Sequence, residues 1–270
     1  MVLSDSSALY LNFAKTFSHN LPPEIRVDLL QHAEDFDAQK TDLIVTVGVR
    51  AAYRVAEKTT QPLLAAMIPS NVYADLPGLR QSQISAIYLD QPWGRQVELL
   101  RAVMPQRKRI GVLYSGSQDM SVLRSELDRY HATLIARHLG SKDTLSADLD
   151  ELLANSDVLL AVPDSEIYNA NSIRNILLSS YRRGIPLVGF SEAYVKAGAL
   201  CAIFSTPEQL ALQAASTVAA FAKSGKLPDA QFPTKYSIAV NQQVARTLGL
   251  ILQSGDAILL QVEKSSGGSR

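Results

Sequence analysis

The chain contains the same strand–helix–strand pattern twice. The first copy, residues 42–73, runs DLIVTVG, a helix-like stretch and then PLLAAMIPSNVY. The second copy, residues 157–194, runs DVLLAVPD, a longer helix-like stretch and then PLVGFSEAY. Each copy ends in Ser-x-x-Tyr, at Ser70 to Tyr73 and at Ser191 to Tyr194. The copies lie roughly 115–125 residues apart, about one domain length, so we expect two similar α/β lobes with a ligand held between them.

Length and composition are those of a globular protein of two domains. The 270 residues are 47% hydrophobic and 19% charged, with a net charge of zero. Nucleic acid is not an expected partner, because neutralising phosphates requires a basic face and the longest basic run is residues 107–109. A single cysteine, Cys201, excludes an intrachain disulfide and a multi-cysteine metal site. Since no stretch of about 20 apolar residues occurs, we expect no direct membrane span.

Apolar runs and helical periodicity alternate along the chain. This alternation predicts an α/β fold of two doubly wound lobes with parallel sheets. The predicted strands are 25–30, 43–47, 63–68, 84–89, 109–114, 133–138, 158–162, 187–190, 202–204 and 236–240. The predicted helices are 9–17, 50–58, 93–104, 122–131, 147–154, 169–183, 207–223 and 242–248.

The segment after residue 225 has no counterpart in the duplicated pattern. We therefore expect it to cross back, so that residues 1–90 and 236–262 form the first lobe and residues 91–235 the second. The polar residues 263–270 are expected to be a flexible tail.

Motifs of catalysis and cofactor binding are missing from the sequence. There is no glycine-rich phosphate loop, and the four histidines have no metal-ligand spacing, so we expect neither a cofactor nor a metal. Ser191 lies in a sequence close to Gly-x-Ser-x-Gly, but no histidine follows His138 to complete the usual hydrolase order. We therefore predict a protein without catalytic residues.

Polar residues recur where the predicted strands end. In open α/β sheets ligands bind outside the carboxyl ends of the strands, so these residues are the candidate ligand contacts. They are Asp5, Ser6, Ser7, Gly48, Val49, Arg50, Ser70, Asn71, Tyr88, Asp90, Tyr114, Ser115, Asp164, Tyr168, Ser191, Tyr194 and Ser205.

Each candidate also has a structural alternative. The hydroxyls and carboxylates could be helix caps and turn formers only. Arg50 could bind an anion such as a carboxylate, or form a surface ion pair. Tyr168 and Tyr194 could stack on an aromatic ligand, or close the core with their hydroxyls in water.

Most of residues 1–250 resembles the substrate-binding proteins of ABC transporters that have the type I periplasmic-binding fold. The resemblance runs through DLIVTVGVRAAYRVAEKTTQPLLAAMIPS, QVELLRAVMPQRKRIGVLYS, DVLLAVPDSEIYNANSIRNILLSSYRRGIPLVGFSEAYVKAGALCAIFSTPEQLALQAA and YSIAVNQQVARTLGL. The most similar group includes binders of aromatic amino acids. The resemblance implies ligand-binding roles for Ser7, Gly48, Val49, Ser70, Ser115, Asp164 and Ser191. Val49-Arg50 departs from the Thr or Ser followed by Pro of many members, so the ligand's identity does not carry over.

The resemblance implies a solute-binding component of an ABC importer that holds a small polar ligand, such as an amino acid or related carboxylate. Its expected partners are the permease and ATPase subunits, and its expected location is periplasmic or extracytoplasmic. Residues 2–7 read as the tail of a first strand, so we expect that a signal sequence has been trimmed. The alternative is a ligand-sensing domain of a regulatory or signalling protein.

Overall fold

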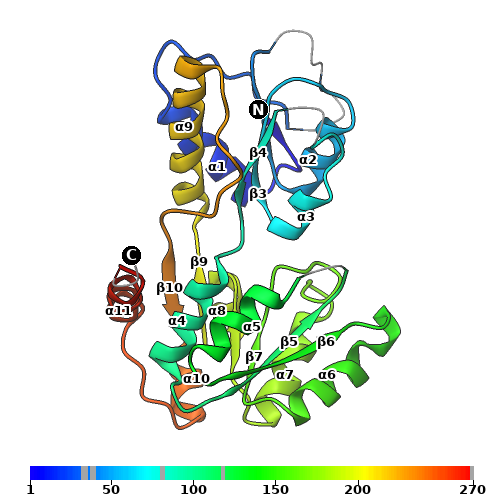
Figure 1. Cartoon of the computed structure of the whole chain (residues 1–270), viewed down its shortest axis with the longest axis vertical. Coiled ribbons are helices and arrows are strands. Elements are labelled where there is room, and N and C mark those ends of the chain that lie inside the picture. Colours follow the sequence, from blue (N-terminus) through cyan, green and yellow to red (C-terminus); the bar gives the residue numbers. More distant parts are fainter. Residues whose placement is uncertain (32–35, 37–40, 80–82, 117–118, 268–270) are drawn as a thin grey trace. The chain divides into compact units, whose positions relative to one another are not determined.

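The computed structural model describes residues 1–31, 36, 41–79, 83–116 and 119–267. The chain forms two compact α/β units (Figure 1). The first unit comprises residues 1–90 and 205–236, and the second comprises residues 91–204 and the chain from 237 onward. The chain therefore passes from one unit to the other three times, after Asp90, Phe204 and Tyr236.

The sheet of the first unit is parallel throughout. Its strands, in spatial order, are β1 (Val2–Leu3), β2 (Ile44–Val47), β3 (Leu63–Ile68) and β4 (Ile84–Tyr88). The strand predicted over 25–30 is wrong, because only Leu30 forms a bridge, to Val2. Because β1 is only two residues long, little more than one residue can pair along its outer edge.

Side-chain alternation divides the first unit into three layers. Leu3, Val47 and Leu64 lie in a core with α1 (Ala8–His19) and α9 (Pro207–Ser224). The alternate residues, such as Val2 and Ile44, lie in a separate core with α2 (Val49–Ala56). A short helix, α3 (Ser70–Ala74), follows β3. Helices therefore cover both faces of the sheet, as the buried β-branched runs predict.

The sheet of the second unit has six strands in the order β10-β9-β8-β7-β5-β6. They are β5 (Arg109–Tyr114), β6 (Thr133–His138), β7 (Val158–Leu160), β8 (Leu187–Gly189), β9 (Cys201–Phe204) and β10 (Ser237–Val240). The helices are α4 (Trp93–Val103), α5 (Ser121–Asp128), α6 (Leu145–Ala154), α7 (Ile173–Arg182), α8 (Glu192–Ala197), α10 (Gln242–Thr247) and α11 (Gly255–Gly267). Only β10 runs antiparallel to its neighbour among the described pairs.

The position of the C-terminal segments corrects the expected lobe boundaries. Strand β10 pairs with β9 and α11 packs on α4 and β10, so residues 237–262 join the second unit rather than the first. Residues 205–236, expected in the second lobe, belong to the first unit because α9 buries Leu210 and Ala214 against α1. The predicted tail is wrong over residues 263–267, which continue α11.

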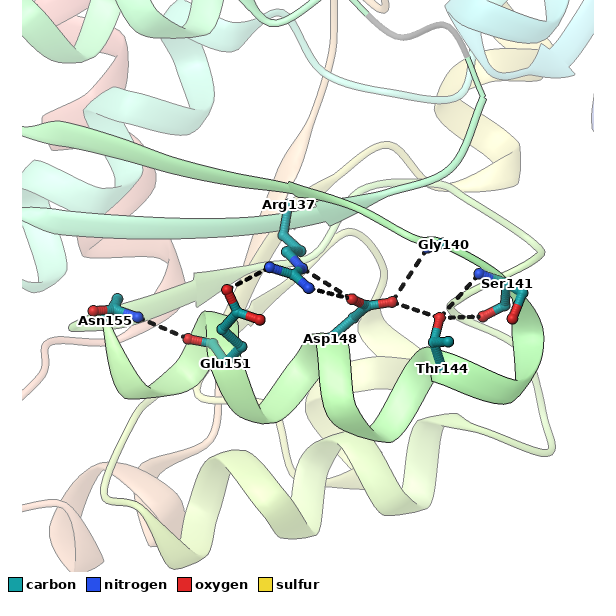
Figure 2. Close-up of polar contacts among 7 residues, drawn as sticks. All are labelled: Arg137, Gly140, Ser141, Thr144, Asp148, Glu151 and Asn155. Atoms are coloured by element: carbon teal, nitrogen blue, oxygen red, sulfur yellow. Dashed lines mark hydrogen bonds and ion pairs between the residues drawn. The ribbon is translucent and has the colours of Figure 1, made fainter.

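A charged network fastens the edge strand β6 to α6 (Figure 2). The Arg137 guanidinium pairs with Asp148 at 2.7 Å and with Glu151 at 2.5 Å. Asp148 also accepts hydrogen bonds from the Thr144 hydroxyl at 2.7 Å and the Gly140 N–H at 3.2 Å. The Thr144 bond, followed by Arg137 and Gly140, lowers the pKa of Asp148 to about 2. This carboxylate therefore stabilises the fold in its ionised form.

We expect Asp148→Asn to lower the free energy of unfolding at neutral pH. Because the folded-state pKa lies below the unfolded value, this stabilisation is present above about pH 4 and declines as the pH falls toward 2. Urea unfolding between pH 7 and pH 2.5 should show the difference between variant and parent narrowing over that interval. Asp150→Asn is the control, since Asp150 lies on the same helix with its side chain 56% exposed. A difference that did not change with pH would contradict the assignment.

Candidate functional site

A serine and an aspartate meet at the carboxyl end of the sheet in the first unit. Ser70 follows β3 and Asp90 follows the neighbouring strand β4. The Ser70 N–H donates to one Asp90 oxygen at 2.8 Å, and the Ser70 hydroxyl donates to the other at 2.5 Å. Burial raises the pKa of Asp90, and the hydrogen bonds from Ser70 oppose that rise. The carboxylate is thus held in one orientation at the strand ends.

The second unit has the same pairing. Ser115 follows β5, and Asp164 follows the neighbouring strand β7. The Ser115 N–H donates to Asp164 at 2.6 Å, and its hydroxyl lies 2.8 and 2.9 Å from the two carboxylate oxygens. The Glu166 N–H donates a further bond at 3.0 Å, and Asp164 is only 7% exposed. Each unit therefore carries a buried or half-buried carboxylate, oriented by a serine, at its sheet's carboxyl end.

The backbone at Gly48 requires glycine. Its φ is +87°, and a Cβ atom would lie 2.5 Å from the Tyr10 hydroxyl and 2.7 Å from Ser4 Oγ. Gly48 precedes the first turn of α2, where Ser4 Oγ accepts a hydrogen bond from the Ala51 N–H at 3.0 Å. The first N–H groups of α2 thus lie at the strand ends, where the helix dipole favours an anion.

Arg50 lies in the first turn of α2 and remains largely accessible. Its guanidinium lies 3.8 Å from Asp5, with the two side chains 70% and 45% exposed. The Ser7 hydrogen bonds lower the pKa of Asp5, with a smaller contribution from Arg50. An exposed ion pair of this kind contributes about 1 kcal/mol or less, so it leaves Arg50 available to a ligand anion.

Three aromatic residues cluster beside Asp164. Tyr168 is 5% exposed and its ring centroid lies 6.1 Å from that of Phe190 and 6.5 Å from that of Tyr194. The Tyr194 hydroxyl donates to the Tyr168 carbonyl at 2.9 Å. The Tyr168 hydroxyl is buried and has no hydrogen-bond partner within the described residues. Burial, then Asp164, raises the pKa of Tyr168, which is therefore a neutral donor.

A second aromatic cluster lies at the strand ends of the first unit. The Tyr88 ring packs edge-on against Tyr73 at 5.6 Å and against Phe232 at 5.0 Å. The Tyr73 hydroxyl donates to the Ile84 carbonyl at 2.8 Å. Burial, followed by Tyr73 and Asp90, raises the pKa of Tyr88 to about 12. Tyr73 and Tyr194 hold matching places in the duplicated sequence, and each anchors its cluster through a backbone carbonyl.

The remaining candidates have mixed roles. The Ser205 hydroxyl donates to the Lys235 carbonyl at 2.7 Å, and the Tyr114 ring packs edge-on against His138 at 5.3 Å. Ser191 is the half-buried N-cap of α8 without a side-chain capping bond. Asn71 lies half-buried in α3, and the exposed Ser6 hydroxyl donates to Gln31 at 3.2 Å.

One feature of the site was missed from the sequence. Met67 lies at a break in the register between β3 and β4 and has a φ of +57°. Such a conformation is costly for a residue other than glycine, and it lies three residues before Ser70. A methionine carries no signal for this conformation, so the sequence offered nothing to find it by.

Two features are absent from the part of the chain that is described, a cluster of metal-ligating side chains and a membrane-spanning helix. No group of three or more His, Cys, Asp or Glu there is arranged to hold a metal ion. None of the described helices combines the length and the apolar character needed to cross a bilayer.

Known proteins are similar to this chain in sequence and in fold. A tyrosine-binding protein from Clostridioides difficile (strain R20291) is 22% identical over 240 residues, which cover 84% of this chain and 68% of that protein. A solved ABC domain in complex with L-Trp from Streptococcus pneumonia superposes with a TM-score of 0.71 at 19% identity, covering 96% of both chains. The ligand-free, open structure of the substrate binding protein CD0873 from Clostridium difficile has a TM-score of 0.69 at 20% identity, covering 94% and 95%.

These likenesses confirm the predicted fold class, two α/β units with mainly parallel sheets. The resemblance noted in the sequence is confirmed as well, because the family model for the ABC transporter substrate binding protein matches residues 24–264. The chain belongs to the ABC transporter substrate binding protein family.

Proposed function

We propose that this protein binds an amino acid with an aromatic or other apolar side chain and presents it to an ABC permease and its ATPase. The observation that carries the proposal is the combination, in each unit, of an oriented carboxylate and an aromatic cluster at the carboxyl end of the sheet. The relative that is named a tyrosine-binding protein and the structure solved with L-Trp support the same ligand class.

The charges at the strand ends suit a zwitterion. Asp90 and Asp164 attract the α-ammonium group, while the first turn of α2 and Arg50 attract the α-carboxylate. The aromatic clusters offer rings for an apolar side chain. A neutral sugar would offer these charged groups no opposite charge, which disfavours it.

Binding is linked to recognition by the permease in this proposal. We infer that the contacts of the ligand at the strand ends favour the conformation that the permease recognises. The protein acts outside the cytoplasm in this proposal, as members of its family typically do. In this proposal the protein binds its ligand and releases it unchanged.

A ligand screen tests this function directly. Free ligand at about 100 times its dissociation constant should raise the free energy of unfolding by about 2.7 kcal/mol. In thermal-shift assays we expect tyrosine, tryptophan, phenylalanine or an aliphatic amino acid to raise the melting temperature, and the matching decarboxylated amines to fail. If ribose or inositol raised it and no amino acid did, the proposal would be wrong.

Asp164 and Asp157 lie at opposite ends of β7 and form a matched pair of variants. Asp164→Asn should weaken amino-acid binding by roughly 10- to 150-fold, because a charged hydrogen bond contributes about 1.5–3 kcal/mol. Asp157→Asn removes the ion pair with Arg109 before the strand and should leave the affinity unchanged. Calorimetric titration measures both, and equal losses in the two variants would indicate a general structural effect instead.

Tyr168 and Tyr194 provide a second matched pair. Tyr168→Phe should stabilise the ligand-free protein by about 1 kcal/mol, because a buried hydroxyl without a partner costs about 1–3 kcal/mol. Tyr194→Phe should destabilise it by about 0.5–1.5 kcal/mol, because it loses a formed hydrogen bond. If the ligand supplies the missing partner of Tyr168, Tyr168→Phe also weakens binding several-fold. Unchanged affinity would indicate that the Tyr168 hydroxyl does not contact the ligand.

A further inference from the structure

A cavity of about 370 Å³ lies at the amino-terminal end of the second unit's sheet. Its walls come from α4, from the residue that precedes β5, from the turn between α5 and β6, and from α11. Helices α4 and α11 pack side by side (Figure 1). Since Ser115 and Asp164 follow their strands and Lys108 precedes β5, the cavity is at the other end of the sheet from the proposed solute site.

The charged lining of this cavity is mainly basic. It contains Arg101, Lys108 and Arg129 but one carboxylate, Glu98. Arg101 and the Tyr130 hydroxyl are both bound to Glu98, at 3.0 and 2.5 Å, so that carboxylate is already occupied. The lining therefore keeps a positive charge after its internal ion pair is counted.

Lys108 is the cation that is least neutralised. Its Nζ donates to the Tyr130 carbonyl at 3.0 Å, a neutral acceptor, and no carboxylate of the described residues forms an ion pair with it. Arg129 pairs with Glu126 at 3.1 Å, with its own side chain 65% exposed. An exposed pair of this kind exchanges readily for a stronger partner.

The rest of the lining suits an organic body. Ala102 and Pro105 supply apolar surface, and the Tyr130 ring lies beneath the Arg101 guanidinium at 3.9 Å. Gln261, from α11, also lines the cavity. A volume of about 370 Å³ is within the roughly 300–1,000 Å³ typical of small-molecule sites. A bare inorganic anion would leave most of it empty.

The geometry points to a second ligand site, separate from the solute site, that binds a small organic anion. Lys108 and Arg129 hold its oxyanion, a carboxylate or a phosphate, and its apolar part lies against Ala102 and Pro105. This inference does not depend on the proposed function, because the two sites share no residue.

Benzoate and phenyl phosphate serve as probes, with benzamide as the neutral analogue. In calorimetric titrations we expect one or both anions to bind and benzamide to fail. Lys108→Glu should weaken binding at least about tenfold, and Lys108→Arg should retain it. Lys226→Glu makes the same charge change on an exposed lysine of the first unit and should have no effect.

Two further variants keep the test decisive. Ala102→Phe fills the cavity without changing its charge and should abolish binding, so it serves even if Lys108→Glu fails to fold. Asp164→Asn should leave probe binding unchanged, which separates this site from the solute site. Binding of phenyl phosphate but not benzoate, or the reverse, identifies the oxyanion. The inference is overturned if neither anion binds at millimolar concentration, if benzamide binds equally, or if Lys108→Glu and Ala102→Phe leave the affinity unchanged.

Discussion

Parallel pairing of neighbouring strands is the constraint on which the candidate site depends. When two strands run in the same direction, the residues that follow them leave the sheet at the same edge. Ser70 and Asp90 meet because β3 pairs with β4, and Ser115 and Asp164 meet because β5 pairs with β7. In both cases the serine supplies its backbone N–H and its hydroxyl, so the carboxylate is satisfied and fixed before any ligand arrives.

The two copies of the duplicated pattern share side-chain contacts as well as backbone structure. Each copy of Ser-x-x-Tyr leads into a short helix, and its tyrosine hydroxyl is bound to a backbone carbonyl. The copies differ in the residue packed beside that tyrosine. Tyr88 is half-buried in the first unit, whereas Tyr168 is buried with an unsatisfied hydroxyl in the second. The second unit therefore has the stronger demand for a polar partner.

Most regular elements could be predicted from the sequence, but the elements that they pack against could not. Strands 63–68, 109–114 and 133–138 have the predicted bounds, since the local apolar residues and the flanking turn residues determine them. The duplicated pattern could not predict which unit residues 237–267 join. That depends on which strand edge is free to pair and which helix surface is free to be covered.

The candidate site divides in the same way. Ser70, Asp90, Ser115 and Asp164 were all identified by their position after strands, but their pairing and the contacts of Tyr168 depend on side-chain directions that a linear pattern does not contain. Gly48 was identified as a strand-end residue, and its positive φ explains why a glycine is there. Nothing in the sequence pattern predicted the strained backbone at Met67.

Strand β5 lies between the two proposed sites of the second unit. Lys108 precedes the strand and Ser115 follows it, so its six residues hold them about 20 Å apart. Changes at such a distance usually add independently. Coupling would need a moving element that reaches both sites. Helix α4 and strand β10 are the candidates, because each follows a passage of the chain between the units and each packs against α11, a wall of the cavity. If these elements shift when the solute binds, linkage requires the organic anion and the solute to alter each other's affinity by the same factor.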